Sequence, residues 1–179
     1  MAEFSFLNPD KAVRAAKVHA GMHVADLGTG GGFFTRSAAR AVGPSGLVWA
    51  VDANRDLLLR TKALGTAEGL HNIEIVAGNI EERGGSHLPD DEFDFVLAHN
   101  ILFSARDKNT LAEEAWRILK RTGKALVIDW KDSFGGLGPH PSHIVTEAAA
   151  RPLFESEGFT FVESVPCGAY HWGFVMRKK

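Results

Sequence analysis

The chain has 179 residues, of which 45% are apolar and 23% are charged. This length and composition predict one globular domain, residues 1–179, and leave little room for a second. The net charge of −2 gives no overall attraction to polyanions or acidic membranes, so it lends no support to a nucleic-acid partner.

Cysteine content and hydropathy bear on the compartment. Cys167 is the only cysteine, which excludes a disulfide framework and a three-cysteine metalloid site within the chain. The first 21 residues lack the apolar core of a signal peptide, and no run approaches the roughly 18 apolar residues of a membrane span. We therefore expect a cytoplasmic protein.

Short apolar runs alternate with helix-like segments over the first 130 residues, a pattern typical of βαβ units and a mainly parallel sheet. An opening helix is expected at about 10–20, with Asn8 or Asp10 as its cap. Strands are expected at 22–27, 46–52, 72–77, 93–98 and 124–130, and helices at 32–42, 54–68 and 107–120.

The C-terminal part follows a different pattern. A Gly/Pro-rich loop after Trp130 is of the kind that often covers a binding site. A helix is expected at 142–157, with Ser142 as its cap. Two alternating runs, 159–165 and 170–177, flank a hairpin signal at 166–168. The predicted fold class is α/β, a doubly wound, mainly parallel seven-stranded sheet with an antiparallel C-terminal hairpin.

A glycine-rich loop, Gly28 to Gly32, stands between the first strand and the next helix. Glycines there allow tight turns and close approach to a ligand, and the helix start favours an anionic group. A dinucleotide fingerprint would need glycine at position 33, which is Phe33, and no Walker lysine follows. The spacing that fits is D-x-G-x-G-x-G, beginning at Asp26.

Asp52 ends the second predicted strand, 24 residues after Gly28. A carboxylate at this position can accept both hydroxyls of a ribose. The alternative role is a helix N-cap, which Asp52 or Asn54 could fill.

These motifs, with others in the same order, resemble the class I S-adenosylmethionine-dependent methyltransferases, especially the ubiquinone/menaquinone-biosynthesis type. The resemblance extends from about Phe6 to Arg177. It rests on VADLGTGGG at 24–32, VWAVDAN at 48–54, AGNIEE at 77–82, LPDDEFDFVLAHNIL at 88–102 and EEAWRILKRTGKALVIDW at 113–130. The chain departs from the family at Asn79, where Asp is frequent, and at 121–123, where Pro-Gly-Gly is usual.

The resemblance implies S-adenosylmethionine as the cofactor. Its methionine part would lie along 26–32, its ribose at Asp52, its adenine between Ala53 and Asn79–Ile80, and its sulfonium near 98–100. The implied cofactor-binding residues are Asp26, Gly28, Thr29, Gly30, Gly32, Asp52, Ala53, Asn79, Ile80, Ala98, His99 and Asn100.

Two residues are candidates for a chemical role. His99, at the end of the fourth strand, could act as a base if the acceptor must lose a proton, or it could only pack there. Lys131 could steer an anionic acceptor, or it could be a solvated lysine. Asp129 and Trp130 close the fifth strand and are expected to face the same crevice.

Histidines of the C-terminal part allow a metal site or a pocket. His140 and His143, with Asp129 or His171, could ligate a metal, but H-x-x-H on a Pro-rich loop is a weak signal. We therefore predict no metal, and keep His140, His143 and His171 as a possible acceptor pocket. Tyr170, Trp172 and Trp130 could form its wall.

The predicted activity is methyl transfer to an unidentified small-molecule acceptor, while nucleic acid or protein acceptors stay open. One alternative is a non-catalytic protein that binds the cofactor as a sensor or assembly partner. Another is an NAD-dependent oxidoreductase, which Phe33 opposes. The sequence gives no indication of the oligomeric state.

Overall fold

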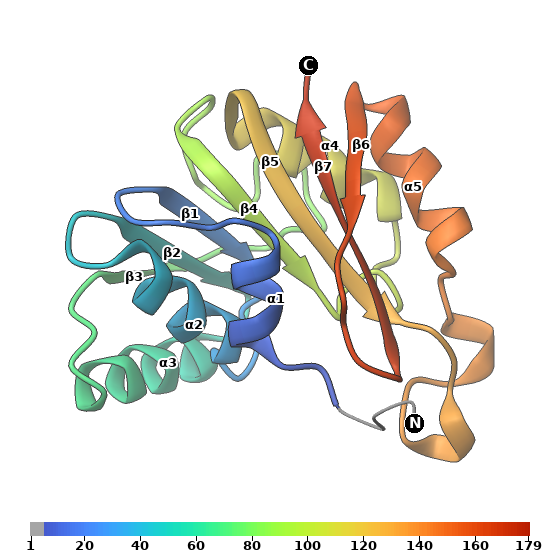
Figure 1. The fold of residues 1–179 in the computed structure, drawn as a ribbon, viewed down its shortest axis with the longest axis horizontal. Coiled ribbons are helices and arrows are strands. Elements are labelled where there is room, and N and C mark those ends of the chain that lie inside the picture. Colours follow the sequence, from blue (N-terminus) through green and yellow to red (C-terminus); the bar gives the residue numbers. More distant parts are fainter. Residues whose placement is uncertain (1–5) are drawn as a thin grey trace.

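Seven strands form one twisted sheet, which helices cover on both faces (Figure 1). The computed structural model describes residues 6–179. The strands are β1 (His23–Leu27), β2 (Leu47–Asp52), β3 (Ile73–Ala77), β4 (Phe93–His99), β5 (Leu119–Trp130), β6 (Phe159–Ser164) and β7 (His171–Lys178). Their order is β3-β2-β1-β4-β5-β7-β6, and β7 is antiparallel to both of its neighbours. The predicted fold class is confirmed.

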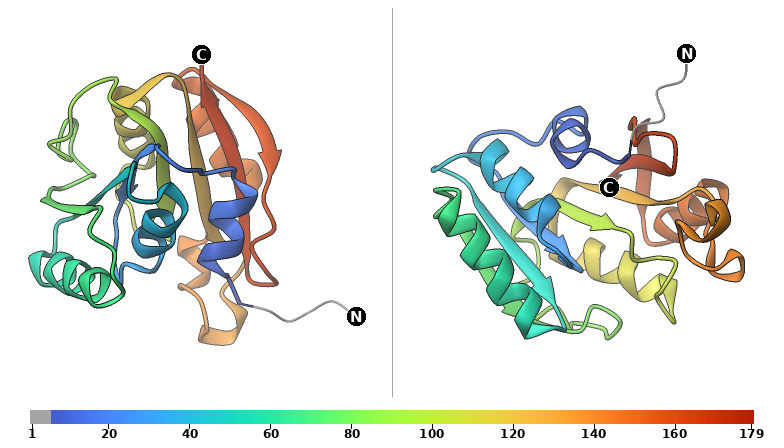
Figure 2. Two further views of the ribbon diagram at one scale, coloured as in Figure 1. Left: turned by 60° about the vertical axis from the view of Figure 1, so that its left-hand side comes forward. Right: turned by 90° about the horizontal axis from the view of Figure 1, so that it is seen from below.

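Alternate side chains of the strands build a core on each face of the sheet. Helices α1 (Pro9–Ala15), α2 (Phe33–Val42) and α3 (Arg55–Ala67) cover one face, and α4 (Lys108–Ile118) and α5 (Glu147–Ser156) cover the other (Figure 2). Val24 and Leu97 pack toward the first group, whereas Ala25 and Val96 pack toward the second. Among the helices of residues 6–179, none has the length and apolar character to cross a membrane.

The opening helix is shorter than the predicted 10–20. It ends at Ala15, because Lys17 has a left-handed φ of 64° that no helix continues through. Asn8 rather than Asp10 caps it, accepting a hydrogen bond from the Lys11 N–H at 2.9 Å.

Two other predicted helix boundaries were wrong. Residues 141–143 form a separate 3₁₀ turn, and α5 begins at Glu147 with Thr146, not Ser142, as its cap. The helix predicted at 107–120 ends at Ile118, and β5 begins directly at Leu119 instead of at 124. A register irregularity against β4 accommodates this longer strand.

The chain order reverses between β1 and β4, which are neighbours in the sheet but not in sequence. From β1 the chain moves outward through β2 and β3, and it then returns to β4 on the other side. In doubly wound sheets the crevice outside the carboxyl ends of the strands at such a point is where ligands bind. The glycine loop follows β1, and His99 ends β4, so the fold brings both to this crevice.

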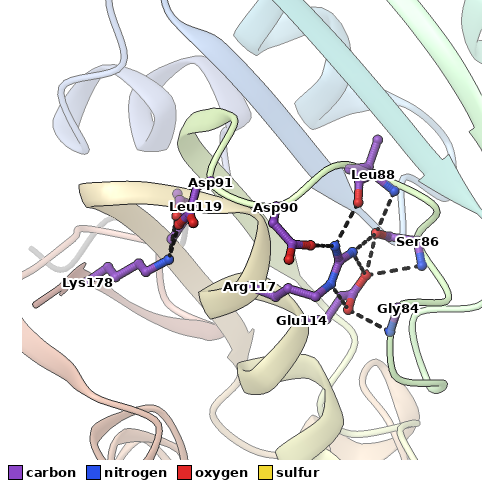
Figure 3. A network of polar contacts seen from close by, with 9 residues as sticks. All are labelled: Gly84, Ser86, Leu88, Asp90, Asp91, Glu114, Arg117, Leu119 and Lys178. Atoms are coloured by element: carbon purple, nitrogen blue, oxygen red, sulfur yellow. Dashed lines mark hydrogen bonds and ion pairs between the residues drawn. The ribbon is translucent and has the colours of Figure 1, made fainter.

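A buried ionic network fixes the crossover between β3 and β4 (Figure 3). Glu114 of α4, only 1% exposed, accepts N–H bonds from Gly84 and Ser86 at 3.0 and 3.2 Å. Arg117 holds Glu114 through two nitrogens, at 2.6 and 3.0 Å, and donates to the Leu88 carbonyl at 2.8 Å. Burial opposes ionisation of Glu114, but Arg117 and the other donors outweigh it and lower the pKa of this carboxyl. The crossover includes residues 78–82, so the network supports one wall of the candidate site.

Candidate functional site

Three glycines of the loop have left-handed backbones, with φ of 75° at Gly28, 53° at Gly30 and 71° at Gly32. A Cβ on Gly28 would lie 2.3 Å from Ile101 Cδ1, and one on Gly32 would lie 2.3 Å from Thr61 Oγ1. A Cβ on Gly30 would have no neighbour closer than 4.0 Å. Packing against Thr61 therefore requires glycine at 32, whereas at Gly28 only the flexible end of Ile101 would have to move and the left-handed φ is what favours glycine. Gly30 faces open space that a ligand could fill.

The carboxylate of Asp52 is held in place by the backbone. Its Oδ2 accepts the Gly30 N–H and its Oδ1 accepts the Asn54 N–H, both at 2.9 Å. Asn54 caps α3, accepting from Asp56 and Leu57. This settles the cap alternative in favour of Asn54 and leaves Asp52 at the carboxyl end of β2 beside the glycine loop.

A cavity of about 250 Å³ opens beside Asp52. It is lined by Gly28, Asp52, Ala53, Gly78, Asn79, Ile80, Glu81, Ile101, Ala105, Asp107 and Leu111. The structure thus brings together the residues that the sequence predicted for ribose and adenine. Ile101 and the residues from α4 and its approach were missed, because only the tertiary fold carries them to β2.

A second cavity, of about 460 Å³, lies on the other side of Gly28, which lines both. Its lining residues are Phe6, Leu7, Pro9, Gly28, Thr29, Gly30, Gly31, Phe33, Phe34, His99, Asn100, Trp130 and His171. It is the larger of the two cavities that Gly28 lines, and we call it the large cavity. Its walls are mostly apolar, and the N-terminal segment contributes three residues that carried no local sequence signal.

His99 and Asp26 form a buried pair at the inner end of the large cavity. His99 Nε2 lies 2.9 Å from Asp26 Oδ1, and the imidazole stacks on Phe34 with ring centroids 4.2 Å apart. Asp26 is fully buried, and its Oδ2 accepts the Thr35 hydroxyl at 2.5 Å. Asp26 occupies Nε2, and the other ring nitrogen, Nδ1, makes no hydrogen bond among residues 6–179.

Asn100 lines the same cavity and carries a buried, unpaired side-chain oxygen. Its φ of 51° places it in the left-handed region, and its N–H donates to the Ile128 carbonyl at 2.8 Å. Its Oδ1 is buried without a hydrogen-bond partner in the described chain. A buried unpaired oxygen costs stability, which makes Asn100 a candidate to contact a polar group of a ligand.

Of the predicted site residues, Asp26, Gly32, Ala98, Asp129 and Lys131 line neither of these two cavities. Ala98 is fully buried in the core. Asp129 was expected to face the crevice, which is wrong: it is fully buried and accepts N–H bonds from 101, 102, 103 and Trp130 at 2.8–3.3 Å. Burial raises the pKa of this carboxyl. Asp129 therefore fixes the segment after β4 rather than contacting a ligand.

Lys131 lies outside the large cavity. Its side chain is exposed, and Nζ donates to the Gly168 carbonyl at 3.2 Å. It lines an adjoining cavity with Cys167 and Glu147. Burial of Cys167 raises the pKa of its thiol to about 12, so the group there is an uncharged thiol.

The three histidines predicted for an acceptor pocket do not lie together in the structure. His140 and His143 are exposed on the loop after β5 and line neither site cavity. His171 is 3% exposed and does line the large cavity, next to Trp130. Within residues 6–179 no cluster of three or more metal-ligating side chains is present.

Comparison with known proteins identifies the family of this chain. Residues 18–169 match the methyltransferase domain family along their whole length. The chain belongs to that family. A solved SAM-dependent methyltransferase from Aquifex aeolicus superposes with a TM-score of 0.86 at 25% identity, covering 97% of this chain and 91% of that one. This domain thus has the Rossmann-like methyltransferase fold, and its cofactor is S-adenosylmethionine.

Curated relatives carry several acceptor names. A ubiquinone/menaquinone biosynthesis C-methyltransferase from Hahella chejuensis is 36% identical over 115 residues, 63% of this chain and 45% of that protein. A demethylmenaquinone methyltransferase from Geobacillus stearothermophilus is 29% identical over 65% and 49%. An arsenite methyltransferase from Halobacterium salinarum is 29% identical over 61% and 27%. The chain spans about half the length, or less, of these relatives.

Proposed function

We propose that this methyltransferase domain transfers the methyl group of S-adenosylmethionine to a small-molecule acceptor held in the large cavity. The observation that carries the proposal is that two cavities meet at Gly28. One of them has the Asp52 carboxylate at its edge, and the other has the His99–Asp26 pair. A cofactor across this junction would have its adenosine on one side and its methyl group toward the other.

The chain fits the cofactor on several independent grounds. Asp52 is oriented for a ribose, and Ala53 and Ile80 wall the space beside it. Gly30 faces open space, and the start of α2 at Gly32 has no side-chain cap, which suits the methionine carboxylate. Asn100 Oδ1 is an acceptor suited to the methionine ammonium.

The chemistry asked of the protein is limited, because bound S-adenosylmethionine supplies an activated methyl group. The chain must orient both reactants and, where the acceptor atom carries a proton, accept it. His99 is the proposed base. If it donates Nε2–H to Asp26, then Nδ1 is left as a proton acceptor on the cavity side.

Lys131 remains a proposed accessory residue. It lies beside the large cavity rather than in it, so it could steer an anionic acceptor but would have no role with an uncharged one. It does not suit proton transfer at His99.

Relatives named for quinone-pathway substrates or arsenite suggest a small acceptor, since all of these are small molecules. A three-thiolate arsenite site would need three cysteines, and this chain has only the buried Cys167. We therefore propose an organic acceptor.

Two measurements test the proposal. Titration calorimetry with S-adenosylmethionine and S-adenosylhomocysteine should give micromolar binding, and absence of binding by folded protein would overturn the cofactor placement. Release of S-adenosylhomocysteine should then be measured over a panel of small organic acceptors. Tight cofactor binding without turnover on any acceptor would instead support the alternative function, a non-catalytic cofactor-binding sensor or assembly partner.

Variants of the buried pair test the base. His99→Gln should lower kcat by about 10²- to 10⁴-fold for an acceptor that must lose a proton. Asp26→Asn should also lower kcat, because an amide N–H donated to Nε2 would force the ring proton onto Nδ1. His143→Gln, on the exposed loop, is the matched control. Unchanged kcat in His99→Gln would reduce His99 to a packing role.

A further inference from the structure

His171 is a buried imidazole with no hydrogen bond. It is 3% exposed, and neither Nδ1 nor Nε2 has a partner within the described chain. Buried polar atoms are nearly always paired, so two unpaired nitrogens on one ring are exceptional. The ring stays in place through packing, since it lies against Trp130 with centroids 4.2 Å apart and its residue pairs with Trp130 across β5 and β7.

The position of His171 relates it to the acceptor rather than to the cofactor. It lines the large cavity together with His99 and the glycine loop, but it comes from β7, beyond β5 in the sheet. The cofactor-binding elements end at β4 and the residues that follow it. His171 therefore borders the part of the cavity that the proposed cofactor placement leaves for the acceptor.

The charge of the cavity walls restricts what can bind there. The described lining residues include no Lys, Arg, Asp or Glu, and Phe6, Phe33 and Trp130 contribute broad apolar surfaces. A charged acceptor bound in this cavity would lose its hydration without gaining an ionic partner from the cavity walls, which is costly. Charged side chains near His171, Lys131 and Glu147, line the adjoining cavity instead. Burial, and next the nearby Lys131, lower the pKa of His171 to about 4, so the imidazole itself is uncharged near neutral pH.

We propose that His171 is an acceptor-binding, specificity-determining residue whose imidazole hydrogen-bonds an uncharged hydroxyl group on an otherwise apolar acceptor. A ring nitrogen accepts from or donates to that hydroxyl, while Trp130 and the phenylalanines cover the apolar body. Both ring nitrogens are buried, so a lining side chain such as Phe6, which is 59% exposed, must move before an acceptor can reach them. This inference rests on the proposed function, because that function assigns the cavity to the acceptor.

Benzyl alcohol is a suitable probe, with toluene, benzoate and benzylamine as controls that lack the hydroxyl or carry charge. Binding is followed by NMR shifts of the His171 ring nitrogens, with and without S-adenosylhomocysteine. In wild type, benzyl alcohol should bind roughly tenfold more tightly than each control, which corresponds to one net hydrogen bond. Equal affinities for benzyl alcohol and toluene, or a stronger preference for a charged control, would overturn the proposal.

Variants separate recognition from packing. His171→Phe keeps a ring but removes both nitrogens, so it should abolish the preference for alcohol over toluene. His171→Gln, which can still hydrogen-bond, should restore part of it, and His143→Phe should leave it unchanged. His171→Phe should also raise the thermal midpoint, because it removes two unpaired buried atoms. A lower midpoint with the alcohol preference intact would show a purely structural histidine and refute the proposal.

The proposed function and the role of His171 can be refuted separately. Loss of S-adenosylhomocysteine binding would refute the proposed function, whatever the probe does. Normal S-adenosylhomocysteine binding with an alcohol preference that survives His171→Phe would refute only the role of His171.

Discussion

The uncharged state of His171 makes the stability of the protein depend on pH. Its pKa lies at about 4 in the folded chain and near the ordinary 6.5 in the unfolded chain. Between these values the unfolded chain binds the proton and the folded chain does not. The stabilisation from neutral His171 is therefore fully present above pH 6.5 and is lost as the pH falls from 6.5 toward 4.

The size of the effect follows from the two pKa values. At pH 5, protonation of the unfolded state lowers the free energy of unfolding by about 2 kcal/mol relative to pH 8. Asp10, Asp94 and Glu114 have lowered pKa values and also lose stabilisation in acid. These three carboxyls are unchanged in a variant that alters only His171, so their contribution cancels when the variant is compared with wild type.

Urea unfolding at pH 8 and pH 5 measures this effect in wild type, His171→Phe and the exposed control His143→Phe. The difference between the two pH values should be about 2 kcal/mol smaller in His171→Phe than in the other two proteins. Equal acid destabilisation in all three proteins would show that His171 titrates normally in the folded state and would refute the reasoning.

Three further outcomes follow from the site and its support. Asp52→Ala should weaken S-adenosylmethionine binding by about 10- to 100-fold in calorimetry, through the lost charged hydrogen bonds; unchanged affinity would remove Asp52 from the ribose site. Gly30→Val should prevent cofactor binding while circular dichroism shows a folded protein, and binding by this variant would place the ligand elsewhere. Glu114→Ala should lower the free energy of unfolding by about 3 kcal/mol, because Arg117 loses its buried partner. A loss below about 1 kcal/mol would show that the network contributes no more than a surface ion pair does.

The sheet could be predicted from the sequence because each strand carries its own local signal. Apolar runs and glycine turns mark β1 to β4 within a residue or so. Boundaries that depend on single backbone conformations or on pairing with a neighbour were less accurate. Lys17 at positive φ ends α1 early, and β5 begins at Leu119 because pairing with β4 recruits residues that resemble a helix end.

The two cavities of the candidate site also differ in how well the sequence predicted them. The half built on β1, β2 and the turn after β3 was predictable, since its motifs lie on short segments of fixed spacing. The other half comes from Phe6, Trp130 and His171, which are far apart in sequence. Nothing local distinguishes His171 from His140 or His143, and only burial in the folded chain does.

Unpaired polar atoms mark where folding alone does not account for a residue. Four such buried atoms occur among residues 6–179: Thr61 Oγ1 and three that belong to Asn100 and His171, which both line the large cavity. Elsewhere the fold pairs its buried charges closely, as it does at Glu114. Leaving buried polar atoms unpaired costs stability, and most of that cost falls on residues that line this cavity. A ligand that pairs with them would recover that stability only when bound, so the same atoms provide both affinity and selectivity.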